Sequence, residues 1–205
     1  MYCRRLLTSI AAFLFLAAGH AFGADSLNRS PFMPINGQAT QPIGHYDLCK
    51  RLPIECKEHT ASTKPVHLTS ALWKELIAVN DTVNTTIKPD TDMNIYGVEE
   101  YWNYPDSGRG DCEDYVLLKR RDLMQKGWPA GSLLITVVRQ TNGDGHAVLT
   151  VRTDRGDLIL DNLEGRIKLW NETDYQFIKR QANLDSGLWV SIDDDRSVLV
   201  GSIKR

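Results

Sequence analysis

The clearest periodic pattern in the chain is a run of apolar side chains at intervals of three and four positions. Its members are Leu72, Leu76, Val79, Val83 and Ile87. This spacing predicts an amphipathic helix of about four turns. Thr69 or Ser70 is suited to cap the start of the helix, and Pro89 is suited to end it.

A second helix is predicted over residues 112–126. Asp111 suits the N-cap position, and Gly127 suits the position just after the last turn. Two acids in the first turn, Glu113 and Asp114, favour the positive end of the helix dipole.

After residue 132 the period changes from helical to extended, which predicts strands. The first three are Leu133–Arg139, His146–Arg152 and Leu158–Leu160, and the glycine-containing turns 142–145 and 154–157 between them predict hairpins. Four further candidates are Arg166–Trp170, Tyr175–Lys179, Leu188–Ile192 and Ser197–Ile203. Helices followed by a meander of strands predict an α+β domain over residues 69–205, with N-terminal helices packed on an antiparallel sheet.

The N-terminus has the pattern of a secretory signal peptide. Arg4 and Arg5 precede an apolar run from Leu6 to Gly19, and small residues follow. A membrane anchor is the alternative, but this run is shorter than the roughly 20 residues that span a bilayer. We therefore expect residues 1–23 to be removed on export and the protein to be periplasmic or secreted.

The rest of the composition is that of an ordinary folded protein. The chain has 205 residues, 42% of them hydrophobic, and a formal net charge of −2. A chain of this charge offers no basic surface for nucleic acid. Residues 24–68 are rich in turn-forming residues, show little periodicity and predict an irregular N-terminal arm.

The cysteines point to one reactive thiol. Cys3 lies in the predicted signal peptide, so three of the four cysteines remain, and an odd number in an exported protein indicates a free thiol or an intermolecular bridge. An oxidising compartment favours a disulfide between Cys49 and Cys56, which leaves Cys112. A metal site formed by Cys49, Cys56 and His59 is an alternative, but its spacing matches no familiar zinc pattern.

Cys112 has a position suited to nucleophilic chemistry. It begins the second predicted helix, where the dipole favours the thiolate form. On its own it could equally be a small buried residue. His146, however, begins a predicted strand, and Asp161 follows the next strand, so antiparallel pairing should place these two side by side. The order predicts a catalytic triad of Cys112, His146 and Asp161.

The acids around Cys112 oppose that chemistry unless something compensates for them. Asp111, Glu113 and Asp114 place negative charge beside the thiol, which should raise its pKa. A bound calcium ion would reverse the local field, since carboxylates are calcium ligands. The alternative, that these acids only cap the helix, stays open. A second acidic stretch, 90–94, lacks the residues of an EF-hand but could lend a ligand.

Four segments resemble the bacterial transglutaminase-like cysteine proteinases: Tyr101-Trp102-Asn103-Tyr104-Pro105, Gly110-Asp111-Cys112-Glu113-Asp114-Tyr115, His146-Ala147-Val148-Leu149 and Leu160-Asp161-Asn162. The resemblance covers roughly residues 70–192. It implies a papain-like, transglutaminase-type core with the triad named above. Because Trp102 lies just before the nucleophile, we expect it in the substrate groove.

The characterised branch of this family, the LapG-type proteases, is periplasmic and calcium-dependent. The resemblance therefore implies calcium bound by Asp111 and Glu113, with Asp114 as a further candidate, and no organic cofactor. It also implies a protein substrate, in that branch a large surface adhesin whose release disperses biofilm, and control by an inner-membrane cyclic di-GMP receptor.

Limited proteolysis is thus the leading hypothesis, and two others stay open. Amide transfer or deamidation on glutamine begins with the same acyl-enzyme, so the residues do not separate it from proteolysis. A calcium-binding interaction module without turnover is the third hypothesis.

Overall fold

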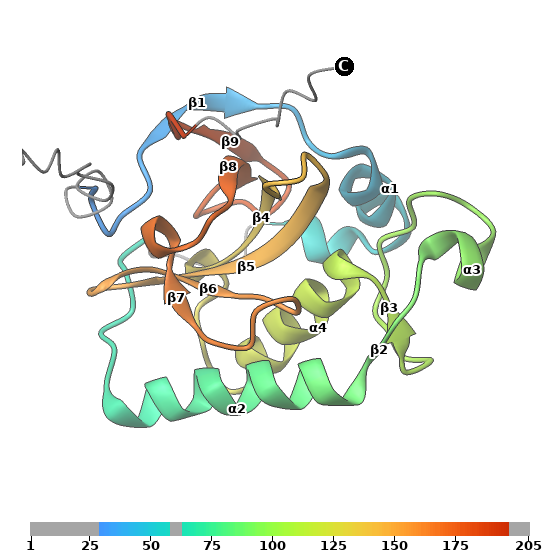
Figure 1. The fold of residues 1–205 in the computed structure, drawn as a ribbon, viewed down its shortest axis with the longest axis horizontal. Helices are drawn as coiled ribbons and strands as arrows, with labels where there is room; N and C mark the ends of the chain where they lie inside the picture. Colours follow the sequence, from blue (N-terminus) through green and yellow to red (C-terminus); the bar gives the residue numbers. More distant parts are fainter. Residues whose placement is uncertain (1–28, 58–62, 197–205) are drawn as a thin grey trace, which may run out of the picture.

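The computed structural model describes residues 29–57 and 63–196. The predicted signal peptide, His59 and the predicted strand over 197–203 lie outside these residues. Within the described part, seven strands form one sheet in the order β1-β9-β8-β4-β5-β6-β7, and every neighbouring pair is antiparallel (Figure 1). The strands are β1 (Ile35–Ala39), β4 (Leu133–Arg139), β5 (Gly145–Thr153), β6 (Gly156–Leu160), β7 (Lys168–Leu169), β8 (Gln176–Gln181) and β9 (Trp189–Ile192).

The four α-helices of the described residues lie between β1 and β4 in the sequence, before most strands of the sheet. They are α1 (Ile43–Arg51), α2 (Ser70–Thr86), α3 (Asp92–Tyr96) and α4 (Cys112–Gln125), with 3-10 turns at Pro53–Cys56, Ala130–Ser132 and Trp170–Glu172. A short parallel pair, β2 (Lys88–Pro89) and β3 (Arg109–Gly110), joins the segment after α2 to the segment before α4. The predicted α+β class, with helices packed on an antiparallel sheet, is confirmed.

Both predicted long helices are present, with boundaries close to those expected. The Thr69 hydroxyl accepts a hydrogen bond from the Leu72 N–H, so Thr69 rather than Ser70 caps α2. Asp111 occupies the N-cap position of α4, but its side chain makes no capping bond there. Its carboxylate is therefore available for another role.

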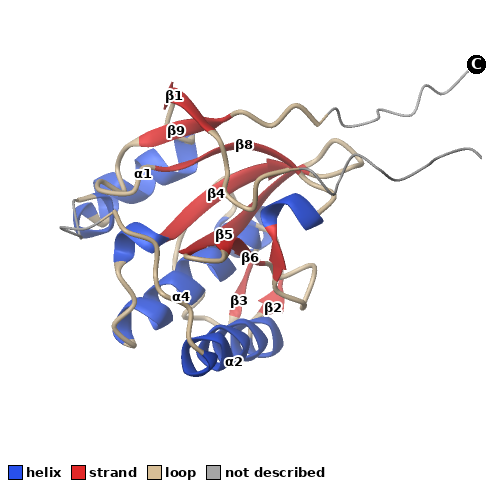
Figure 2. Ribbon diagram, turned by 90° about the vertical axis from the view of Figure 1, so that its left-hand side faces the viewer, coloured by secondary structure: helices blue, strands red, loops and turns tan. Residues whose placement is uncertain are grey.

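The sheet has a different hydrophobic cluster on each face. The helical face packs against α2 and α4, and alternate residues of β5 (Ala147, Leu149 and Val151) belong to that larger cluster (Figure 2). The smaller cluster on the opposite face contains Met33, Val138, Val148, Ile159, Trp170, Phe177 and Ile192. The alternation along the strands thus decides which side chains meet α4 and which lie away from it.

The prediction of an irregular arm over residues 24–68 is wrong for the stretch from 35 to 56. This stretch forms β1, α1 and a 3-10 turn, and β1 pairs with β9 at the edge of the sheet. The strand β1 mixes apolar and polar residues (INGQA) and is almost entirely exposed, so burial imposes no alternating pattern on it. Its pairing partner lies about 150 residues away, which no local pattern reveals.

The segment between the two long helices contains α3 and β3. One smaller prediction also needs correction. The predicted strand Arg166–Trp170 is reduced to the two residues of β7, since the chain turns into a 3-10 helix at Trp170. Among the described residues, no helix has the length and apolar character needed to cross a membrane.

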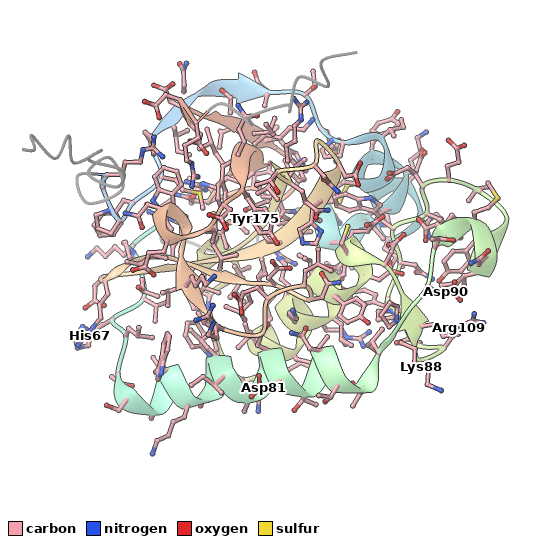
Figure 3. The ribbon with its side chains drawn as sticks, in the orientation of Figure 1. His67, Asp81, Lys88, Asp90, Arg109 and Tyr175 are labelled. Atoms are coloured by element: carbon pink, nitrogen blue, oxygen red, sulfur yellow. A yellow bond between two sulfur atoms is a disulfide. The ribbon has the colours of Figure 1, made fainter. Side chains whose placement is uncertain are left out.

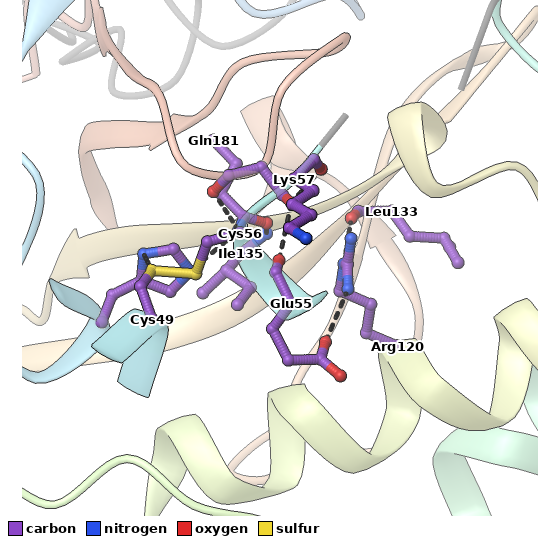
Figure 4. A network of polar contacts seen from close by, with 10 residues as sticks. Cys49, Glu55, Cys56, Lys57, Arg120, Leu133, Ile135 and Gln181 are labelled. Atoms are coloured by element: carbon purple, nitrogen blue, oxygen red, sulfur yellow. Dashed lines mark hydrogen bonds and ion pairs between the residues drawn. A yellow bond between two sulfur atoms is a disulfide. The ribbon is translucent and has the colours of Figure 1, made fainter. Parts of the chain in front are cut away.

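Cys49 and Cys56 are joined by a disulfide that closes the end of α1 onto the following turn (Figure 4). Beside it, the buried Arg120 of α4 donates from Nε to the Leu133 carbonyl oxygen at 3.1 Å, and its Nη1 lies 3.4 Å from Glu55 Oε2. The N-terminal segment is therefore fastened to the helix that carries Cys112. Cys112 itself is the free cysteine of the described residues.

Candidate active site

The predicted contact between His146 and Asp161 is present in the structure. His146 Nε2 lies 2.8 Å from Asp161 Oδ1, and each side chain is only 3% exposed. The contact follows from the register of β5 and β6, in which Leu149 pairs with Leu160. One position beyond that pair, Asp161 lies opposite Val148. Val148 is two residues from His146, and the His146 imidazole reaches across this distance to the Asp161 carboxylate.

Asp161 is held as an anion by several donors. Its Oδ1 also accepts from the Leu163 N–H at 3.0 Å, and its Oδ2 accepts from the Tyr175 hydroxyl at 2.6 Å. Burial works to raise the pKa of Asp161, but the hydrogen bonds from His146, Tyr175 and Leu163 outweigh it and lower the pKa. A buried carboxylate of this kind fixes the imidazole with Nε2 as its donor and leaves Nδ1 for another partner.

Cys112 lies at the first residue of α4, which packs against β5. Its Sγ donates to Glu113 Oε2 at 3.1 Å, and no hydrogen bond joins it to His146, although both residues are described. Burial and then the charge of Glu113 raise its pKa well above the ordinary value, while a hydrogen bond from the backbone of Ala147 opposes that rise. The sulfur therefore lies against the backbone directly after His146, held as a thiol by an acid.

Three carboxylates beside the thiol come close enough to share a cation. Oxygen atoms of Asp92, Asp111 and Glu113 all lie within 4.8 Å of one another. Asp92 Oδ1 and Asp111 Oδ1 are buried without a hydrogen-bond partner. Burial is the first cause that raises the pKa of each of the three. Clustered carboxylate oxygens, two of them buried without a hydrogen-bond partner, are the donor set that a hard cation such as calcium prefers, and its charge would favour their ionised form.

The third predicted metal ligand, Asp114, is not part of this group. Its Oδ1 accepts from the Asn103 N–H at 2.9 Å, and burial raises its pKa to about 8. Asp92 takes the third place in the group, from the acidic stretch that the sequence marked as able to lend a ligand. The order of residues along the chain gives no sign that α3 folds back onto the start of α4.

The prediction that Trp102 lines a substrate groove is not supported by its position. Its side chain is 4% exposed and belongs to the larger core cluster. The indole packs edge-on against His45 and Trp189, and its Nε1 donates to Glu100 Oε2 at 3.1 Å. Its position next to the nucleophile in sequence therefore reflects packing beneath the site.

Tyr175 is a site residue that sequence reasoning missed. Its ring lies 5.5 Å from the His146 ring, and its hydroxyl bonds to Asp161. The sequence placed it at the start of a strand with no motif around it. Only the sheet order, which brings β8 to the same end as β5 and β6, reveals the contact.

Comparisons with known proteins identify the family of this chain. The family model described as bacterial transglutaminase-like cysteine proteinase BTLCP matches residues 35–197. The calcium-bound LapG of Legionella pneumophila is 29% identical, with a TM-score of 0.51 over 62% of this chain and 74% of that one. A second structure of Legionella pneumophila LapG is 30% identical, with a TM-score of 0.50 over 60% and 70% of the two chains. No match is found among curated proteins.

Proposed function

Because the chain belongs to the bacterial transglutaminase-like cysteine proteinases, we propose that it is an endopeptidase that cuts a secreted or surface protein at a limited number of sites. The observation that carries the proposal is the buried His146–Asp161 pair at the same strand end as the free thiol of Cys112. In this proposal Cys112 is the nucleophile, His146 is the general base and acid, and Asp161 orients the imidazole.

The proposed steps give each of these groups one role. His146 Nδ1 takes the thiol proton, and the sulfur attacks the carbonyl carbon of the scissile bond. His146 then protonates the leaving amine, and water hydrolyses the thioester in the second half of the reaction. The backbone N–H of Cys112, the first residue of α4, is a candidate donor to the oxyanion, since the first N–H groups of a helix have no intrahelical partner.

Calcium fits the acidic group that adjoins the nucleophile. Asp92, Asp111 and Glu113 would hold it, and its charge would offset theirs beside the thiol. Glu113 has two competing roles here, because the carboxylate that accepts the Cys112 S–H bond also belongs to this ligand group. The calcium-bound form of the Legionella pneumophila LapG structure supports the assignment of calcium as the ion.

The compartment and partners form part of the proposal. The predicted signal peptide and the disulfide between Cys49 and Cys56 support export to the periplasm, where disulfides persist. The substrate class is then an exported protein, with a large surface adhesin as the first candidate. Control by an inner-membrane cyclic di-GMP receptor rests on the family resemblance alone.

The test compares the mature protein with Cys112→Ala on the periplasmic and surface proteins of the source cells. New protein N-termini are mapped by mass spectrometry in calcium, with and without a fluorescent primary amine. A few cleavage sites that appear only with wild-type protein support limited proteolysis. Incorporation of the amine without new N-termini would instead indicate amide transfer, and neither product would refute both activities.

A further inference from the structure

We propose that Tyr175 is a positioning residue that holds the Asp161 carboxylate in the orientation needed to support His146. The inference rests on the proposed function and adds a fourth side chain to the catalytic unit. Three observations carry it: the hydroxyl contact, the position of the ring and the division of donors between the two carboxylate oxygens.

The sheet places Tyr175 beside the other two residues for a simple geometric reason. Val148, Ile159 and Phe177 belong to the cluster on the face of the sheet away from α4. His146 precedes Val148 by two positions, Asp161 follows Ile159 by two, and Tyr175 precedes Phe177 by two. Since side chains alternate along strands, all three residues continue this face to the end of the sheet where β5 begins. Cys112 lies at that same end, against the backbone of Ala147. Figure 3 shows Tyr175 among the strands, well away from α2.

The donors to Asp161 are divided unequally between its oxygens. Among the residues that the structure describes, Oδ1 accepts from both His146 Nε2 and the Leu163 N–H, whereas Oδ2 accepts only from the Tyr175 hydroxyl. The hydroxyl bond, at 2.6 Å, is the shortest of the three. With Oδ2 fixed, the carboxylate cannot rotate about its bond to Cβ, and Oδ1 remains in line with the imidazole.

The Tyr175 ring adds a second restraint. It lies 5.5 Å from the His146 ring, tilted by 57°, so it limits rotation of the imidazole on that side. Tyr175 and Asp161 both line a cavity of about 190 Å³, whose other lining residues include Gln140, Thr141, Glu164, Arg166 and Asp174.

The charged groups around this unit come from every element packed against it. His146 faces Asp161 from β5, and the buried Lys119 of α4 attracts the Asp161 carboxylate electrostatically. Burial, then the hydrogen bond to Asp161, and then the charges of Asp161, Glu164 and Asp174 raise the pKa of Tyr175. The tyrosine hydroxyl is thus kept protonated and can act only as the donor toward Asp161 while that carboxylate is ionised.

The experiment uses full-length mature protein labelled with ¹³C at the aspartate carboxyl carbon, and it compares wild type with Tyr175→Phe. Asp161→Asn identifies the resonance of Asp161, and Tyr46→Phe on the exposed face of α1 is the matched control. Loss of the hydroxyl should raise the pKa of Asp161 by about one, because a hydrogen bond to the charged form is removed. Tyr46→Phe should leave it unchanged.

A second measurement tests the effect on the nucleophile. Tyr175→Phe should slow modification of Cys112 by iodoacetamide about tenfold at neutral pH in calcium, with an unchanged unfolding temperature within a few degrees. In an Asp161→Ala background the same change should have no further effect, because the hydroxyl acts through that carboxylate.

The proposal is overturned by an unchanged Asp161 titration, by an unchanged rate at Cys112, or by additive effects in the double variant. The NMR titration needs no substrate and no turnover. If no Cys112-dependent cleavage of any protein were found, the proposed function would fail, and the contact between Tyr175 and Asp161 would still be decided separately.

Discussion

Replacing Asp161 by asparagine separates the charge of this residue from its hydrogen bonds. Oδ1 faces two N–H donors, from His146 and Leu163, whereas Oδ2 faces the hydroxyl of Tyr175, which can rotate and accept instead. We therefore expect the amide NH₂ to take the Oδ2 position and the amide oxygen to keep facing His146. The imidazole tautomer is then retained, and only the negative charge is lost.

The size of the effect follows from Coulomb's law, because both side chains are only 3% exposed. A unit negative charge and an imidazolium about 4 Å apart attract each other by about 4 kcal/mol at an effective dielectric constant of about 20. Each factor of ten in rate corresponds to about 1.36 kcal/mol. Asp161→Asn should therefore slow alkylation of Cys112 through the imidazolium–thiolate pair by up to about 10³-fold.

The assay is the second-order rate of iodoacetamide modification of Cys112 at neutral pH in calcium, followed by intact mass. His146→Ala gives the rate of the thiol without imidazole assistance, and Asp161→Asn should lie between this rate and that of wild type. A decrease of less than about tenfold would refute the charge argument. A fall to the His146→Ala rate would show that the tautomer is lost and that the amide orientation inferred here is wrong.

Thermal unfolding at several pH values provides the control for this variant. The folded pKa of Asp161 is lowered, so its contribution to stability is present above the pKa of an unfolded aspartate and is lost as the pH falls through the folded pKa. Wild type should therefore be more stable than Asp161→Asn near neutral pH, and the two should converge in strong acid.

Three other predictions test separate parts of the structure. Asp92→Asn should weaken calcium binding at least about tenfold by isothermal titration calorimetry, while Asp106→Asn, on an exposed loop, should not; equal affinities would remove Asp92 from the ligand group. Replacing Cys49 and Cys56 together by serine should lower the free energy of unfolding by about 2.5 kcal/mol, because the unfolded chain regains the conformational entropy that the disulfide removes by closing a loop with a sequence separation of 7. An unchanged unfolding midpoint would contradict this. Burial lowers the pKa of Lys119 to about 7, so its positive charge destabilises the folded state fully below that pH and progressively less as the pH rises toward the pKa of an unfolded lysine. Lys119→Met should therefore stabilise the fold more at pH 6 than at pH 9, and the reverse order would be inconsistent with a buried amine that has no hydrogen-bond partner.

The parts of the fold that the sequence predicted are those determined by local pattern. The three- and four-residue apolar spacing in α2 and the extended pattern in β4 and β5 are properties of short windows, and all three elements form where expected. The strand β1 was missed because its residues are mostly exposed and its stability comes from pairing with the distant β9. Pairing of that kind depends on the whole sheet.

The candidate site divides in the same way. The neighbours His146 and Asp161 belong to one hairpin, so antiparallel geometry was enough to bring them together. Asp92 and Tyr175 reach the site from a separate helix and from a strand on the far side of β4, and only the folded chain shows their contacts. For Trp102 the sequence suggested a site role that the fold does not support: its nearness in sequence to Cys112 predicted a place in a groove, but the side chain is buried.

The most direct test of the account is the labelling of Cys112 by iodoacetamide in wild type and His146→Ala, each with calcium and with a chelator, with the modified peptide mapped. Fast labelling of Cys112 in wild type with calcium, and slow labelling after chelation or after loss of His146, is the predicted result. A Cys112 that stays unlabelled in calcium, or that reacts equally fast without His146, would contradict the assignment of this thiol as the nucleophile.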